Sequence, residues 1–334
     1  MLATSVELPD SGLEWFLEHF RQFFLEFPEI TVAANELWMQ VLEFLEKSLS
    51  TLVSHCGECA IGPLQKDDVN RLVAEVRTSV IELGEDAEQH RILIQIFSKF
   101  EQEFLDGQFN SLESNFEERV LQVAGELNKV TIFQLMSTMI AGPESRHRGT
   151  NPTIHTARVI CEWLLEASSR FTKENLTGEN LWSFREELLA VMLHDLGKVL
   201  NPRFDGHHKI SWTLARESVS ALFAHFDLDS RSDDKVNFMI SMHDMCGHIA
   251  AGRMPYSEVL EDFQRVDEDY MRSLFYVQLS DMRAIKAMPM SHKHENITIW
   301  SMLCFDLGFD ELIDEMIKKF PQFSDILNRR LSFA

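Results

Sequence analysis

The chain has 334 residues, of which 45% are hydrophobic and 10% aromatic, and its formal net charge is −22 at pH 7. This length is typical of about two domains, and the hydrophobic content is sufficient for a sizeable packed core. The excess of acidic residues argues against generic binding to nucleic acids or anionic membranes, which requires a surplus of Lys and Arg. No apolar stretch reaches the roughly 18 residues of a membrane helix, and no signal peptide is visible. We therefore expect no membrane association and a cytoplasmic location.

The first 140 residues show helical periodicity but no catalytic constellation. Apolar residues between Ser11 and Ser50 fit two amphipathic helices, and helical spacing resumes from Asp67 to Leu127. Gly and Pro are scarce, and the alternation of polar and apolar residues typical of strands is missing, so an all-α fold is expected. We expect residues 1–140 to form a helical bundle that regulates the rest of the chain, makes a homo-oligomer or contacts a protein partner.

Residues 141–152 differ in character, because two glycines and two prolines fall within twelve residues. Such a composition indicates a loop or a junction between domains. Arg146 and Arg148 make this stretch locally basic in an acidic protein. Two interpretations stay open, namely a solvated linker and an arm that helps to hold a phosphate.

The apolar run from Leu188 to Leu193 ends in the adjacent pair His194 and Asp195, with Gly197 and Lys198 just beyond. The spacing of its apolar residues predicts a buried helix, and Gly197 is expected to end it because glycine adopts the left-handed conformation readily. A polar pair is costly to bury unless something compensates it. A divalent cation is such a compensation, since imidazole and carboxylate are both good ligands.

Four further segments carry His or Asp on an apolar helix or in a loop that enters one: His155, the pair His207 and His208, His243, and Asp281. Together with the His-Asp pair they predict ligands that converge inside a helical bundle, which is how such bundles build metal sites. A site of imidazoles and carboxylates suits Mn, Fe, Co, Ni, Zn or Mg, and Asp195 could bridge two ions. His248 is expected at the surface.

In order and context these residues resemble the signature of the HD superfamily of metal-dependent phosphohydrolases. The sequence HDLGK at 194–198 is similar to the HD-[IL]-G-K box of that family. The sequence GHHKIS at 206–211, followed by Leu-Ala, resembles the G-H-E-x-I-G…L-A segment of CCA-adding-enzyme and ribonuclease Y-type HD domains. The stretch 277–284 is similar to the segment that supplies the last aspartate. The resemblance covers about residues 150–290 and implies an HD-domain helical bundle, with residues 291–334 as C-terminal helices that pack on it.

The resemblance also implies a ligand set, whose core members are His155, His194, Asp195 and Asp281. In members with two metals, His243 and one further histidine complete the set. The downstream Ile210 register favours His207 as that histidine, whereas the spacing from His194 favours His208, so the choice stays open.

Two narrower assignments fit less well. The chain has Asp244 after His243 where two-metal cyclic-dinucleotide phosphodiesterases usually have a second histidine, and it lacks their Gly-Tyr-Pro signature. It also lacks the nucleic-acid-binding module of ribonuclease Y.

The resemblance implies a phosphomonoesterase or phosphodiesterase that hydrolyses a small phosphate compound, such as a nucleotide, with a water activated by one or two divalent ions. Asp195 is the expected catalytic carboxylate, and Lys198 is the first candidate for a cation that faces the phosphate. Weaker candidates for that role are Arg146, Arg148, Lys209 and Arg283. Two other classes stay open: an HD-type di-iron oxygenase with the same six ligands, and a non-catalytic HD signalling or interaction module.

Overall fold

The computed structural model describes residues 87–109, 112–137, 151–199, 207–226, 228, 230–286 and 288–321. All regular secondary structure in these residues is helical, which confirms the predicted all-α fold. None of the helices described is long and apolar enough to cross a membrane. Residues 1–86, and with them most of the predicted N-terminal bundle, lie outside the described residues, as do Arg146 and Arg148.

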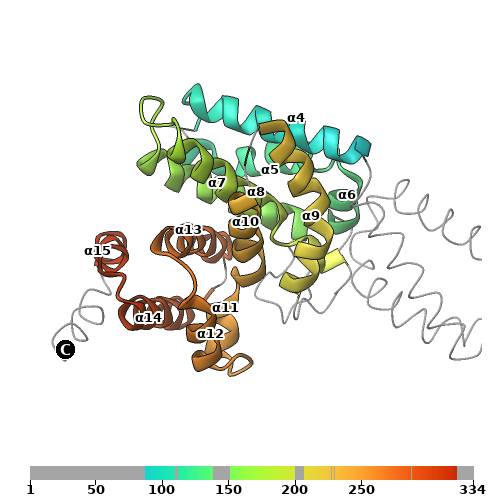
Figure 1. The fold of residues 1–334 in the computed structure, drawn as a ribbon. Coiled ribbons are helices and arrows are strands. Elements are labelled where there is room, and N and C mark those ends of the chain that lie inside the picture. Colours follow the sequence, from blue (N-terminus) through green and yellow to red (C-terminus); the bar gives the residue numbers. More distant parts are fainter. Residues whose placement is uncertain are drawn as a thin grey trace, which may run out of the picture.

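Figure 1 shows the arrangement of the helices in the described part of the chain. They are α4 (Ala87–Leu105), α5 (Phe116–Leu127), α6 (Thr131–Ser137), α7 (Pro152–Arg170), α8 (Glu179–Leu193), α9 (His207–Phe226), α10 (Ser230–Met242), α11 (Met245–Ala250), α12 (Tyr256–Phe263), α13 (Glu268–Ala284), α14 (Met290–Leu307) and α15 (Asp310–Lys319), with the 3-10 turns η1 (Leu112–Asn115) and η2 (Leu196–Val199).

Helices α7 and α8 form the centre of the described structure. The run from Leu188 to Leu193 is buried throughout, which confirms the buried helix predicted there. Helix α7 begins with Asn151 as its N-cap, whose side chain accepts a hydrogen bond from the backbone N–H of Ile154, and with Pro152 in its first turn. It packs against α5, α8 and α13, so it is covered on several sides and is apolar around much of its circumference.

Helices α4, α5 and α6 pack directly on this centre, although the sequence assigns them to the region before the domain junction. Helix α5 lies along α7, α4 crosses α9, and α6 contacts both α7 and η2 (Figure 1). Their apolar side chains join the same hydrophobic core as those of α7 and α8. The ion pair between Arg185 of α8 and Glu101 of α4, at 2.8 Å, reinforces this packing.

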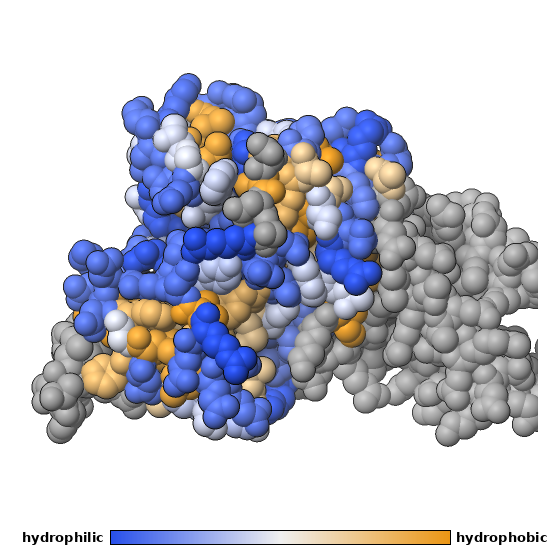
Figure 2. All heavy atoms as spheres, in the orientation of Figure 1, coloured by the Kyte–Doolittle hydropathy of each residue, from blue (hydrophilic) through white to orange (hydrophobic). Residues whose placement is uncertain are grey.

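Helix α10 lies between α8, α9 and α13, and the remaining helices lie beyond α13. Helix α14 packs on α11 and contacts α13 through Trp300, whose ring centroid lies 5.5 Å from that of Phe275. Figure 2 shows a largely hydrophilic face, with apolar side chains visible around α13 and α14 and in places among the helices above them. The fold therefore brings the ends of α8 and α13 and the beginnings of α7 and α9 close to one another.

Candidate metal centre

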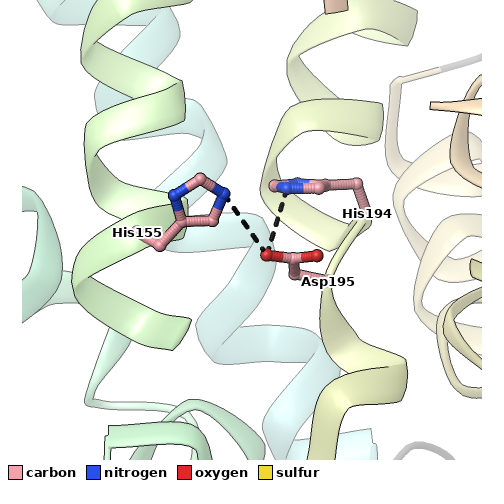
Figure 3. A group of neighbouring side chains, drawn as sticks. All are labelled: His155, His194 and Asp195. Carbon is pink, nitrogen blue, oxygen red and sulfur yellow. Dashed lines mark ion pairs between the residues drawn. The ribbon is translucent and has the colours of Figure 1, made fainter. Parts of the chain in front are cut away.

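Three helices bring the first group of predicted ligands together. His155 lies near the start of α7, His194 and Asp195 follow the end of α8, and Asp281 lies in the last turn of α13. Nε2 of His155 is 2.7 Å from Oδ1 of Asp281 and 3.6 Å from Oδ2 of Asp195. Nε2 of His194 is 3.3 Å from the same Oδ2 and 4.0 Å from Oδ1 of Asp281. Figure 3 shows both imidazoles turned toward the Asp195 carboxylate.

A second group faces the other oxygen of Asp195. His207 is the first residue of α9, and His243 follows α10 directly. Their Nε2 atoms lie 3.0 Å and 3.8 Å from Oδ1 of Asp195, and 3.1 Å from each other. The two oxygens of one carboxylate thus face two separate sets of ligand atoms.

The close packing of η2 on α9 produces this arrangement. The backbone N–H of Gly197 donates a hydrogen bond to Oγ of Ser211 at 2.8 Å. A Cβ at Gly197 would collide with the carbonyl oxygen of His207 and would approach the amide nitrogen of Ser211 to 2.6 Å. The prediction that Gly197 adopts the left-handed conformation was wrong. Gly197 lies in η2 and is not among the glycines with positive φ in the described chain. A glycine is needed here because the two backbones approach each other closely.

Backbone carbonyls orient two of the imidazoles. Nδ1 of His194 donates to the carbonyl oxygen of Val191 at 2.9 Å, and Nδ1 of His243 donates to that of Ile240 at 2.8 Å. In the neutral ring the Nε2 atom then carries the lone pair, and in both residues this atom points toward Asp195. Metal-binding histidines usually have such a second contact, which selects the tautomer that a cation needs.

Two of the inward-facing atoms are buried without good hydrogen-bond geometry. Among the described residues, neither Nε2 of His194 nor Oδ1 of Asp195 has a hydrogen-bond partner. Lone pairs of imidazole and carboxylate that face each other repel unless a proton or a metal ion lies between them. Within the described part of the chain, the ammonium group of Lys198 contacts this carboxylate, with Nζ 2.5 Å from Oδ2 of Asp195.

The electrostatics of four of these groups favour the protonation states of metal ligands. Burial opposes ionisation of Asp195, but the attraction of His194 and Lys198 lowers its pKa well below the usual value. Burial also opposes ionisation of Asp281, but the hydrogen bond with His155 and the attraction of the neighbouring imidazoles together outweigh burial, so this pKa is lowered too. Burial lowers the pKa of His155, and it lowers that of His243 to about 3. The two carboxylates are therefore charged and these two imidazoles neutral at neutral pH, as metal coordination requires.

The pKa of His194 is shifted in the opposite direction to the pKa values of His155 and His243. Burial lowers its pKa, but the charge of Asp195 and the contact with it outweigh burial and raise the pKa above the usual value. A positive charge at this position is thus favoured. The residues present fit a divalent metal ion, because four imidazoles and two carboxylates converge and the site attracts a cation.

The other predicted site residues lie elsewhere or have other contacts. His207, and not His208, lies beside Asp195. Arg283 donates to Glu166 of α7 at 2.8 Å, and Lys209 lies in the first turn of α9. The prediction for His248 was wrong: it is buried, and its Nε2 is 2.9 Å from Oδ2 of Asp244. Asp244 itself was not recognised as a site residue, although its spacing of four from His248 indicates one face of a helix.

Comparison of the chain with protein-family models, with curated proteins and with solved structures finds no match.

Proposed function

We propose that this protein is a metal-dependent phosphohydrolase of the HD type, with a centre for two divalent ions that share Asp195. One set of ligands is His155, His194 and Asp281, and the other is His207 and His243. The substrate is a small phosphate compound such as a nucleotide.

The observation that carries the proposal is the position of the Asp195 carboxylate. It is 1% exposed, with two histidines at 3.3 and 3.6 Å from Oδ2 and two more at 3.0 and 3.8 Å from Oδ1. Burying so many ligand atoms with their lone pairs facing one another costs free energy unless cations compensate them. A buried carboxylate between two groups of imidazoles is an arrangement with which a protein holds a pair of ions in a hydrolytic site.

When bound, the ions would supply Lewis acidity and a water of lowered pKa. The residues of the chain orient the ligands and place a positive charge beside the centre. The carbonyl oxygens of Val191 and Ile240 hold His194 and His243 in the tautomer that presents Nε2 to the centre. Lys198 contributes a buried positive charge beside Asp195, where it would offset negative charge on a phosphate oxygen. A cationic side chain at the centre favours an anionic substrate over molecular oxygen.

The test combines metal analysis with a screen for phosphate release. The full chain is stripped with a chelator, loaded with Mn²⁺ or Co²⁺, and assayed against nucleotides and cyclic nucleotides. We expect release of phosphate, or of the nucleoside monophosphate from cyclic substrates, and loss of both turnover and central metal in Asp195→Ala. The variant His225→Gln, which removes an exposed histidine of α9, is the matched control and should behave as the unmodified chain.

The same assay distinguishes the phosphohydrolase from the two other classes, the di-iron oxygenase and the non-catalytic module. Turnover under strict anoxia with Mn²⁺ or Co²⁺ excludes the di-iron oxygenase, whereas substrate oxidation that needs iron and oxygen would support it. Bound metal without turnover of any phosphate compound would favour the non-catalytic module. Activity that survives Asp195→Ala would overturn the ligand assignment.

A further inference from the structure

A second cluster of potential ligands lies next to the centre around Asp195. It consists of His208 in the first turn of α9, Asp244 in the turn after α10, and His248 of α11. Nδ1 of His208 is 3.3 Å from Oδ1 of Asp244, and Nε2 of His248 is 2.9 Å from Oδ2 of the same carboxylate. The two imidazole rings have centroids 5.2 Å apart.

The cluster arises because adjacent residues serve two different groups. His207 faces Asp195, while its neighbour His208 faces Asp244. Successive residues of a helix point about 100° apart, so one helix start presents its first two side chains in two directions. The turn after α10 does the same, since His243 faces Asp195 and Asp244 faces the second cluster.

The donor atoms have the spacing and the chemistry of a metal site. One ligand atom from each residue lies within 4.8 Å of the other two. Both histidines are buried, and Asp244 and His248 are four residues apart, which places them on one face of a helical turn. Two imidazoles and one carboxylate form a set that binds Fe, Mn, Co or Zn and leaves coordination positions open.

The carboxylate also has an unused acceptor. Oδ2 of Asp244 receives the hydrogen bond from His248, but Oδ1 is buried, and no described residue gives it a hydrogen bond. Buried carboxylate oxygens are normally satisfied by a donor or a cation. The Asp244 carboxylate therefore faces two imidazoles and keeps one acceptor oxygen directed into the cluster.

We propose that His208, Asp244 and His248 bind a divalent transition-metal ion of their own, distinct from the ions of the Asp195 centre. This ion ties the start of α9 to the α10–α11 turn and to α11, and so it steadies His207 and His243, the residues adjacent to two of its ligands. Its ligands differ from those of the Asp195 centre, so metal content reports on this site without any measurement of phosphatase activity.

Metal stoichiometry tests the proposal. The full chain is stripped with a chelator, incubated with excess Zn²⁺ and desalted. The ratio of zinc to protein is then measured by inductively coupled plasma mass spectrometry. We expect His248→Gln and Asp244→Asn each to lower the ratio of zinc to protein by one ion per chain, while His225→Gln leaves it unchanged. Asp195→Ala should lose the central ions and retain this one. Circular dichroism verifies that each variant is folded.

An unchanged ratio in folded His248→Gln and Asp244→Asn would overturn the proposal. Crystals of the unmodified zinc-loaded chain provide a test that needs no variant. An anomalous-difference peak bounded by the three side chains supports the site, and a filled Asp195 centre without such a peak rules it out. If Asp195→Ala loses no zinc but His248→Gln loses one ion, the proposed function fails and this site stands.

Discussion

Gly197 and His207 are packed so closely that any side-chain carbon on Gly197 would collide with the backbone carbonyl oxygen of His207. The two residues come from η2 and from the first turn of α9. Because η2 follows Asp195 directly and α9 begins with His207, this contact determines how near the second group of ligands lies to the shared carboxylate. The glycine thus acts through backbone packing.

We expect Gly197→Ala to weaken metal binding and to destabilise the fold by about 1–3 kcal/mol, since a methyl group forced into a filled space displaces the backbone. The free energy of unfolding in urea and the ratio of bound metal to protein measure the two effects. The matched control is Gly125→Ala in α5, where a Cβ meets nothing within 4 Å. Alanine there should be neutral or stabilising by up to about 1 kcal/mol, because it favours the helix. Equal behaviour of the two variants would contradict the packing argument.

The sequence predicted which residue types would converge, because each lies at the end or the beginning of an apolar helix. It could not choose between His207 and His208. Both lie in the first turn of α9, and which one faces Asp195 depends on the rotation of that helix about its axis. The rotation is set by tertiary contacts, among them the hydrogen bond between Gly197 and Ser211, which leave no local pattern.

The burial of His248 depends on tertiary structure in the same way. Helix α11 has only six residues, too few for a periodic apolar pattern, and it is covered by α14, which follows about forty residues later in the chain. Local sequence cannot report such a long-range contact. The pair Asp244 and His248 was recognisable only by its spacing of four.

Acid should destabilise the fold through Glu166 of α7, which is 5% exposed and pairs with Arg283 of α13 and Lys319 of α15. Burial raises its pKa, but the hydrogen bonds from Lys319 and Arg283 outweigh burial, so the pKa in the folded chain lies below 4.5. A carboxyl group with a lowered folded pKa stabilises the fold above its unfolded pKa and loses this contribution as the pH falls through the folded value. We expect Glu166→Gln to cost about 1–3 kcal/mol at pH 7. The cost should shrink below about pH 4.5.

Urea unfolding between pH 3 and 7, in the presence of a chelator, measures this difference. The control is Glu162→Gln on the same helix. Burial raises the pKa of Glu162, so its charge opposes folding at neutral pH and the substitution should be neutral or stabilising. A pH-independent cost of Glu166→Gln would show that the charge of Glu166 is not the source of its effect.

Replacement of Lys198 should reduce turnover without removing the metal. Its Nζ lies 2.5 Å from Oδ2 of Asp195, and the side chain is buried beside the centre. If the proposed function is correct, Lys198→Met removes a cation that offsets charge on the phosphate, and kcat should fall roughly 10²-fold. Lys286→Met, at an exposed lysine that pairs with Glu117, should leave kcat unchanged. An unchanged kcat in Lys198→Met would mean that this lysine only compensates Asp195.

Metal removal should lower the thermal stability of the chain, because the ligands of the Asp195 centre come from α7, the end of α8, α9, the end of α10, and α13. A single ligand at 100 times its Kd stabilises a fold by about 2.7 kcal/mol, which corresponds to a rise in Tm of roughly 4 °C for a chain of this size. We expect Mn²⁺ to raise the Tm of the chelator-treated protein by at least this amount, because more than one ion binds, and circular dichroism follows the shift. In Asp195→Ala, Mn²⁺ should raise the Tm by only the smaller amount that comes from the cluster of His208, Asp244 and His248. In the double variant with His248→Gln, Mn²⁺ should not raise the Tm. A full shift in the double variant would show that the stabilising ion binds elsewhere.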